Sequence, residues 1–328
     1  MQRRLAIMAH LAEAGMLAGR SVLEATAAGN ADLERVHAPR YVRAIGELAR
    51  AGGGWLDYDT VVTPGSDDAA RAAAGAALLA VDQALGEARR ALAVIRPPGH
   101  HALAARGMGF CLYNNIAAAA AYARARHGLE RVLIVDWDVH HGNGTQALFE
   151  RDPAVCFFSI HQSPHYPGTG LAEEMGEGPG RGTTINVPVP AGTGDAGYAR
   201  VLREVLAPAA RRYRPELVLV SAGFDAHADD PLGGTRVTTA GFAALTRQVV
   251  ALAGELCDGR VAFVLEGGYN LHALARSVEA MLRASDDPAP TDPPPSPSPV
   301  DDRLVDGVIA RVRQLHGLRE CRSAGVPE

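Results

Sequence analysis

The chain has 328 residues, 47% of them hydrophobic, which is enough for one large domain or two ordinary ones. Its 32 Lys and Arg residues stand against 37 Asp and Glu residues, and the net charge of −5 argues against a nucleic acid partner. Four cysteines without a CxxC pair indicate neither a disulfide framework nor a zinc ribbon, and the apolar run Ala117–Ala123 is too short to cross a membrane. We therefore expect a cytoplasmic protein without a membrane partner; self-association into a homo-oligomer stays open.

The first part of the chain is predicted to be helical. Ala- and Leu-rich stretches with spaced charges predict helices over residues 3–28, 36–51 and 66–86. Gly52, Gly53 and Gly54 should end the second helix. Asp67 and Asp68 fall in the first turn of the third helix, where the helix dipole favours acidic side chains.

Short apolar runs then alternate with helical segments. Strands are predicted at residues 91–95, 132–135, 155–160, 183–187, 217–220 and 261–265, and helices at residues 115–126, 198–213 and 239–256. The Gly- and Pro-rich stretch 162–182 is predicted to be a long loop, and its length indicates that it forms the rim of a functional site. This order predicts an α/β fold with a doubly wound, mostly parallel sheet.

The domain organisation follows from the composition. Residues 1–284 form one domain in this interpretation, and residues 285–302 change to Pro, Ser and Asp, which is typical of a linker. Residues 303–328 are predicted to hold a helix and a tail. Leu304, Val308 and Val312 have helical spacing, so we expect this helix to pack back onto the domain.

Polar residues follow several of the predicted strands at their carboxyl ends, where parallel sheets place their chemistry. The stretch Asp136–Gly144 comes directly after the strand at residues 132–135. Because residues two apart in an extended segment point the same way, Asp136, Asp138 and His140 should share one face. Two carboxylates and an imidazole suit zinc, manganese or iron. A solvated acidic turn with a capping histidine is the alternative.

Asp225 follows another strand and could complete a three-ligand site with Asp138 and His140, which leaves an open position for water. Taken alone, Asp225 would be better explained as a helix N-cap. Such a metal could lower the pKa of bound water, polarise a carbonyl, or do both.

His100 and His101 follow Pro-Pro-Gly and could be ordinary loop residues, but beside a metal they suggest acid–base chemistry. Asp136 and Asn143 are available as partners for their second ring nitrogens. A charged Asp136 would keep its histidine protonated, whereas a neutral Asn143 would leave the other free to accept a proton. Tyr269, after Gly267 and Gly268, could donate to a developing oxyanion or could be a core tyrosine.

These segments together resemble the zinc-dependent histone deacetylase family, whose superfamily includes acetoin-utilisation proteins and acetylpolyamine amidohydrolases. The resemblance covers most of residues 3–284 and is nearest to the class II-like branch. It is carried by the stretches 96–102, 109–111, 136–144, 159–161, 221–227 and 266–270. The resemblance implies an arginase/deacetylase-like fold.

The resemblance also assigns roles. It implies one zinc ion per chain on Asp138, His140 and Asp225. It makes His101 the main general base and acid, with His100 assisting in a pair with Asp136, and it makes Tyr269 the residue that polarises the amide carbonyl. A structural potassium ion is implied at four residues, largely through main-chain oxygens: Asp136, Asp138, His140 and Ser159.

The resemblance further implies a narrow channel for an acyl-lysine-like chain, lined by Gly109, Phe110 and Tyr166. Many members have a phenylalanine where this chain has Tyr166. Members also begin with a strand and a His-Pro-Glu-rich loop, and this chain starts just after that point. We therefore expect Met1 to be an internal or misassigned start, or the protein to be a truncated form.

The predicted function is a zinc-dependent amidohydrolase that removes acetyl or other acyl groups from N-acylated lysine or polyamine-like amines. Two alternatives stay open. An arginase-type ureohydrolase with paired manganese would gain from the extra acids Asp229 and Asp230, but it does not call for His100, His101 and Tyr269. A non-catalytic module that binds acylated amines would not need the full catalytic set.

Overall fold

The computed structural model describes residues 2–289 and 302–318. At its centre lies a six-stranded sheet in the order β3-β8-β7-β4-β5-β6, and every neighbouring pair is parallel. The strands are β3 (Arg90–Ala93), β4 (Val132–Asp136), β5 (Val155–Gln162), β6 (Thr184–Val189), β7 (Leu217–Ala222) and β8 (Val261–Leu265). A two-stranded antiparallel hairpin, β1 (Gly54–Trp55) and β2 (Val61–Val62), stands apart from this sheet. The predicted α/β fold with a doubly wound sheet is confirmed.

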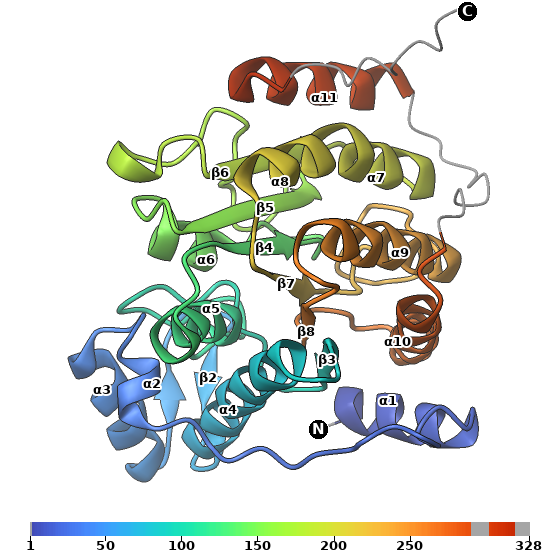
Figure 1. Ribbon diagram of the computed structural model, residues 1–328. Coiled ribbons are helices and arrows are strands. Elements are labelled where there is room, and N and C mark those ends of the chain that lie inside the picture. The colour runs from blue at the N-terminus through green and yellow to red at the C-terminus, as the bar shows by residue number, and fades with distance from the viewer. Residues whose placement is uncertain (1, 290–301, 319–328) are drawn as a thin grey trace, which may run out of the picture.

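Helices precede, connect and follow the strands (Figure 1). The α-helices are α1 (Gln2–Glu13), α2 (Asn30–Leu33), α3 (Pro39–Arg50), α4 (Ser66–Leu85), α5 (Asn115–His127), α6 (Asn143–Phe149), α7 (Asp195–Val201), α8 (Ala207–Tyr213), α9 (Thr239–Leu256), α10 (Leu271–Asp286) and α11 (Asp302–His316). A short 3₁₀ turn, η1 (Gly178–Gly180), and a π-helical segment, η2 (Leu202–Leu206), complete the set. None of the described helices is both long enough and apolar enough to cross a membrane.

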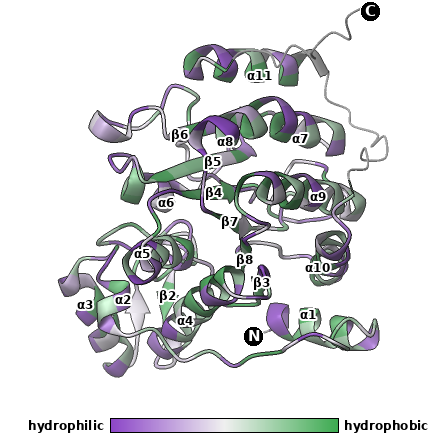
Figure 2. Cartoon of the chain, in the orientation of Figure 1, coloured by the Kyte–Doolittle hydropathy of each residue, from purple (hydrophilic) through white to green (hydrophobic). Residues whose placement is uncertain are grey.

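The central strands are buried on both faces. Every residue of β4, β5, β7 and β8 is buried, which explains why these strands appear in the sequence as continuous apolar runs. Helices α5 and α6 lie on one side of the sheet and α9 and α10 on the other (Figure 1). The strands are largely hydrophobic, and the helices carry hydrophilic residues on their outer faces (Figure 2).

The strand order places a topological switch point between β4 and β7. From β4 the chain continues outward through β5 and β6, and it then returns to add β7 and β8 on the other side of β4. Connections on opposite sides leave a crevice at the carboxyl ends of these two strands, where open α/β sheets bind their ligands.

The first predicted helix is too long. The structure ends α1 at Glu13, not at residue 28, and residues 21–29 are irregular. Gly15 and Gly19 adopt positive φ angles of 67° and 75°, a conformation that ends a helix. Hydrophobic content extended the prediction past these glycines.

Helix α10 was not among the predicted elements. Its N-cap is Asn270, whose side-chain oxygen accepts a hydrogen bond from the Ala273 amide at 3.1 Å. This capping signal, followed by an Ala- and Leu-rich stretch, could have identified the helix. The helix runs to Asp286, past the expected end of the domain at residue 284, and most of the expected linker (residues 290–301) lies outside the described residues.

Helix α11 packs against β6, η2 and α7. Its buried residues are Val305, Ile309 and Val312. The predicted packing residue Leu304 is instead 59% exposed, because the buried face is rotated by one position from the expected one. The tail after residue 318 lies outside the described residues.

Candidate active site

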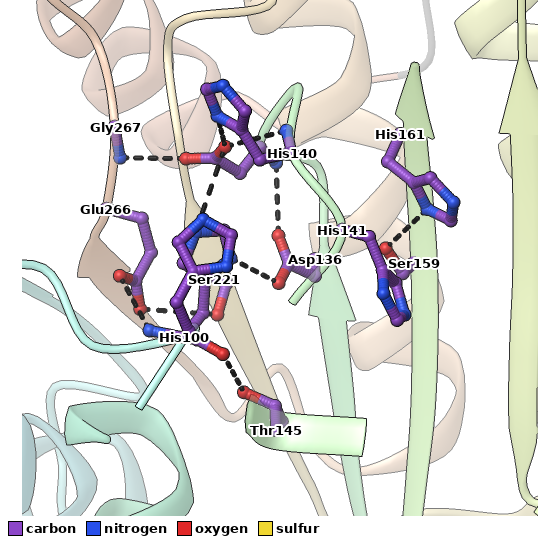
Figure 3. Close-up of polar contacts among 12 residues, drawn as sticks. His100, Asp136, His140, His141, Thr145, Ser159, His161, Ser221, Glu266 and Gly267 are labelled. Carbon is purple, nitrogen blue, oxygen red and sulfur yellow. Dashed lines mark hydrogen bonds and ion pairs between the residues drawn. The ribbon is translucent and has the colours of Figure 1, made fainter. Parts of the chain in front are cut away.

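The polar clusters predicted from the sequence meet at the carboxyl end of the sheet. His100 and His101 follow β3, Asp138 and His140 follow β4, Asp225 follows β7, and Tyr269 follows β8. Figure 3 shows His100, His140 and Glu266 from three different loops converging on Asp136, the last residue of β4. The site therefore lies at the switch point that the strand order creates.

Three side chains form a group that could hold a metal ion. One ligand atom from each of Asp138, His140 and Asp225 lies within 4.8 Å of the others. The His140 Nδ1 atom is 3.0 Å from Asp138 Oδ1 and 3.3 Å from Asp225 Oδ2. The Asp225 Oδ2 atom is buried and has no hydrogen-bond partner in the described chain, although Asp225 Oδ1 accepts from the Val139 amide at 2.9 Å. An orphaned carboxylate oxygen beside an imidazole and a second carboxylate fits a zinc ion.

Asp136 does not join this group. Its Oδ2 atom lies 3.0 Å from His100 Nδ1, and its Oδ1 atom accepts a hydrogen bond from the Asp138 amide. The expected shared face of Asp136, Asp138 and His140 is therefore only partly formed, because the chain leaves the strand at Asp136 and bends. Asp225, from the loop after β7, supplies the third donor.

Two glycines make room for the carboxylates. A Cβ atom at Gly267 would collide with Asp225 Oδ2 and lie 2.6 Å from Asp138 Oδ2, and a Cβ atom at Gly223 would collide with Asp138. The Gly267 amide also donates to Asp138 Oδ2 at 2.8 Å. Backbone approach this close requires glycine at both positions.

The adjacent histidines have different partners, as the sequence suggested. His100 lies between two carboxylates: its Nδ1 atom contacts Asp136, and its Nε2 atom is 3.9 Å from Asp138 Oδ1. The Nδ1 atom of His101 instead lies 2.8 Å from the amide oxygen of Asn143. Since an amide oxygen only accepts, His101 must carry its proton on Nδ1, which leaves Nε2 as an acceptor.

These partners separate the pKa values of the two rings. Burial by itself would lower the pKa of His100, but the charges of Asp136 and Asp138 outweigh burial and raise it well above the usual value. Burial lowers the pKa of His101 well below that value, and the nearby His100 and His140 lower it further. His100 is therefore an imidazolium and His101 a neutral imidazole at neutral pH.

Aromatic rings lie beside His101 and Tyr269. The Tyr166 ring packs edge-on against His101 with centroids 5.1 Å apart, and the Phe110 ring lies 6.0 Å from that of Tyr269. Gly109 is tightly placed, because a Cβ atom there would lie 2.8 Å from the Cγ atom of His101. Burial, together with the charges of Asp225 and Asp138, raises the pKa of Tyr269 well above its usual value, so its hydroxyl keeps its proton.

The comparison with known proteins decides the family. The family model described as the histone deacetylase domain matches residues 1–285. This chain belongs to the histone deacetylase family. Among curated relatives of this deacetylase-family chain, histone deacetylase 14 of Arabidopsis thaliana is 43% identical over 265 residues, covering 77% of the chain and 63% of the relative. A probable deacetylase of Archaeoglobus fulgidus is 43% identical over 267 residues, which cover 80% of this chain and 74% of that relative.

Other comparisons agree with this assignment. Human polyamine deacetylase HDAC10 is 44% identical over 282 residues, which cover 82% of the deacetylase-family chain and 42% of that relative. The crystal structure of the HDA15 HD domain superposes with a TM-score of 0.88 at 38% identity, covering 96% of this chain and 86% of that one. The chain thus spans less than two thirds of the length of some curated relatives, including the Arabidopsis protein.

Several residues that support the site of this deacetylase-family chain were not predicted. The buried carboxylate of Glu266 accepts hydrogen bonds from the amides of Gly99 and His100 at 2.6 and 3.2 Å (Figure 3). The Arg3 guanidinium donates to the carbonyl oxygens of Glu266 and Gly268. Glu266 stands next to Gly267 in the sequence, but no sequence pattern indicates that Arg3, 263 residues away, is its partner.

The turn that carries Phe110 in this deacetylase-family member also has unpredicted support. Phe110 adopts a positive φ of 65°, an unusual conformation for a large side chain. Its amide donates to Thr60 Oγ1 at 2.9 Å, and the amide of Gly109 donates to Asp59 Oδ1 at 3.2 Å. The loop between β1 and β2 therefore holds the turn in place.

The geometry gives no support to the paired-manganese alternative for this deacetylase-family chain. Among the described residues only one three-donor group is present, and it contains neither Asp229 nor Asp230. The carboxylate of Asp230 instead accepts hydrogen bonds from the amides of Leu232, Tyr269 and Asn270. Asp230 thus positions the loop that holds Tyr269.

Proposed function

We propose that this protein is a zinc-dependent amidohydrolase that removes acetyl or other acyl groups from N-acylated amines. One observation carries the proposal: a three-donor metal group lies beside two histidines whose partners give them opposite protonation states. Amide hydrolysis needs an activated water, a proton acceptor and a proton donor, and this arrangement supplies a residue for each need.

Asp138, His140 and Asp225 would hold one zinc ion. When bound, zinc would polarise the scissile carbonyl and lower the pKa of a water molecule. Two carboxylates and one imidazole would leave room on the ion for the carbonyl oxygen and the water oxygen, as in other catalytic zinc sites with three protein ligands.

The histidine pair would manage the protons. His101 has its Nε2 lone pair free, because Nδ1 is engaged with Asn143, so it takes the proton of the attacking water. His101 then returns a proton to the leaving amine. His100, held as an imidazolium by Asp136, assists through its positive charge and is unable to act as the base.

Tyr269 and the aromatic rings would handle the substrate. The protonated phenol of Tyr269 donates a hydrogen bond to the carbonyl oxygen as negative charge develops there. Gly109, Phe110 and Tyr166 would line the channel for the acylated side chain, because their positions bracket His101 and Tyr269. These roles rest on the placement of the rings around the two reactive residues.

The substrate class proposed is acylated lysine or a small acylated polyamine. A human relative is named as a polyamine deacetylase, and other relatives are named as histone deacetylases. We keep a structural potassium ion at Asp136, Asp138, His140 and Ser159 as a prediction, and also a cytoplasmic location, although the Arabidopsis relative is named as chloroplastic. A screen of acylated lysines, polyamines and small amides on the zinc-loaded protein would identify the substrate.

Substitution of a ligand tests the metal assignment. Asp225→Ala should lose bound zinc and turnover together, because it removes one of three protein donors. Zinc content after dialysis against a chelator and turnover of a fluorogenic acetyl-lysine substrate are the two readouts. Asp229→Ala is the matched control, since Asp229 is an acid in the same loop that lies outside the group and should keep both.

A hydroxamate inhibitor separates the enzyme from a silent binding module. The parent protein should hydrolyse the acetyl-lysine substrate, and a hydroxamate, which chelates zinc through two oxygens, should inhibit it. Binding of acetyl-lysine without turnover by the zinc-loaded parent would favour the binding module. Full activity of Asp225→Ala after chelation would show that the metal assignment is wrong.

A further inference from the structure

A cavity of about 430 Å³ lies between β5, β6, α8 and α11. Its wall residues are Cys156, Met175, Arg181, Gly182, Thr183, Ile185, Ala209, Arg212, Tyr213, Leu315 and His316. Cys156 is the second residue of β5, and Thr183 immediately precedes β6, so the cavity lies at the amino ends of the strands. The candidate active site is at the carboxyl ends, which makes the two sites separate.

His316 is the buried polar group of this cavity. It is 6% exposed, and neither of its ring nitrogens makes a hydrogen bond within the described chain, although the Gly182 backbone lies close to the ring. A buried imidazole without a partner is unusual, since buried polar atoms are nearly always satisfied. At least one ring nitrogen is therefore available to a bound molecule.

Two arginines add positive charge to the cavity wall. The Arg212 Nη1 atom donates to the backbone oxygen of His316 at 2.6 Å, which fixes the guanidinium beside the imidazole. Arg212 lines the cavity, and part of its side chain is exposed to solvent. Among the described residues, neither Arg181 nor Arg212 forms an ion pair with an acid. Both arginines are exposed to solvent at the cavity wall, where an anion in the cavity could pair with them.

The rest of the wall limits the kind of anion. Cys156, Met175, Ile185, Ala209 and Leu315 present apolar surface. The backbone amides of residues 181–183 already donate to Gly178, Met175 and Gly180, so no set of free amides is available to surround a phosphate. A planar guanidinium matches a carboxylate, and the apolar surface suits a short hydrocarbon chain.

We propose that this cavity binds a small organic carboxylate with a short apolar chain. The carboxylate lies beside Arg212 and His316, and the chain contacts the apolar wall that α11 completes. The ligand would therefore hold α11 against β6 and α8. This site is independent of the proposed deacylation and is a second binding function of the chain.

Isothermal titration of the zinc-loaded protein with hexanoate tests the proposal, with the neutral amide hexanamide as the matched ligand. A saturating hydroxamate occupies the candidate active site, so that carboxylate binding to zinc is not measured. Hexanoate should bind, and hexanamide should bind at least about tenfold more weakly, because its neutral amide forms no ion pair with a guanidinium. No hexanoate binding, or equal binding of both ligands, would overturn the proposal.

Variants then locate the bound hexanoate. Arg212→Gln should weaken binding by about tenfold or more through loss of a charged hydrogen bond. Arg211→Gln is the matched control: it makes the same charge change on the same helix, but its side chain contacts Glu255, so affinity should stay within about twofold. Arg181→Gln and His316→Phe should also weaken binding. Equal losses in Arg211→Gln and Arg212→Gln would overturn the proposal.

These outcomes do not depend on catalysis. Hexanoate binding that persists in an Asp225→Ala variant supports the cavity even if turnover is absent. Circular dichroism melting of each variant shows whether it is folded. Arg181→Gln, in an exposed loop, tests the site without altering the packing of α11.

Discussion

His100 and His101 are neighbours in the chain, yet their surroundings give them opposite properties. His100 contacts Asp136 through Nδ1 and faces Asp138 through Nε2, so both ring nitrogens carry protons. His101 pairs with the neutral amide of Asn143 and not with a carboxylate, so it stays neutral. The charge of the partner, a carboxylate for His100 and a neutral amide for His101, therefore decides which ring can act as the base.

The role of His101 can be tested by removing its ring. His101→Ala should lose roughly 10²–10⁴ in turnover, which is the usual contribution of a general base, while zinc content stays unchanged. Steady-state kinetics and metal analysis on the same preparation check this. Parent-like turnover in the alanine variant would assign the proton transfer to another group.

Asn143→Asp tests the same pair by a different route. A carboxylate on Nδ1 would stabilise the imidazolium and raise the pKa of His101, so the acid limb of the pH–rate profile should move to higher pH. A profile that stays at the parent position would show that His101 is not the titrating base.

We propose Tyr269 as the hydrogen-bond donor to the developing oxyanion of the substrate. Tyr269→Phe should lose on the order of 10²–10³ in turnover, as for a lost oxyanion donor, and should still bind zinc. Activity on acetyl-lysine should fall mainly in kcat, because the hydrogen bond strengthens in the transition state. Parent-like kinetics would make Tyr269 a packing residue.

At the scale of elements, helix α1 supports the loop after β8. Arg3 from α1 donates through Nε to the Gly268 carbonyl at 2.6 Å, and its guanidinium lies 5.1 Å from the centre of the Tyr269 ring. Helix α1 itself packs on α10, the helix that follows this loop. The start of the described chain and the loop near residue 269 are thus joined into one unit around the phenol.

We expect Arg3→Gln to lower kcat/KM by about tenfold or more, because a charged hydrogen bond to the Tyr269 loop is lost. Zinc content should not change, since Arg3 contacts no metal donor. Arg4→Gln is the matched control, because Arg4 is exposed on the same helix. Arg3→Lys should recover part of the activity. Equal losses for Arg3→Gln and Arg4→Gln would indicate a general effect of charge.

At the scale of the molecule, burial of histidines links stability to pH. His37 is 2% exposed, and its Nδ1 atom lies 3.0 Å from the Leu103 carbonyl while Nε2 accepts from the Asn114 amide at 2.9 Å. This arrangement requires the neutral ring. Burial lowers the pKa of His37 to about 4 and that of His141 also to about 4.

Stability should therefore fall as the pH drops from about 6.5 to about 4. In this window the unfolded chain binds protons on these histidines and the folded chain does not, so each buried histidine costs at most about 1.4 kcal/mol per pH unit. Below about pH 4 both states are protonated at these residues, and their contribution levels off. Urea denaturation at several pH values measures the slope.

A variant pair isolates the contribution of His37. His37→Gln should lower stability at pH 7 but reduce the slope between pH 6.5 and 4. His272→Gln, at an exposed position on α10, should leave the slope unchanged. If both variants keep the parent slope, the pH dependence arises from other groups.

Much of the fold was readable in the sequence, because local patterns encode it. The buried strands appear as apolar runs, and the polar residues after them mark the carboxyl edge of the sheet. The prediction differs from the structure where a glycine or a capping residue overrides hydrophobic content. Gly15 and Gly19 end the helix predicted over residues 3–28, and Asn270 caps α10, a helix that the apolar pattern alone does not predict.

By itself the sequence determined the sheet class, the residue types at the site and the pairing options of His100 and His101. Only the tertiary structure decided that Asp225 joins Asp138 and His140 while Asp136 turns to His100. It alone brought Arg3 to the Gly268 carbonyl. Spacing along a chain constrains neighbours within a few residues, whereas contacts across hundreds of residues depend on the strand order and on how each loop bends after its strand.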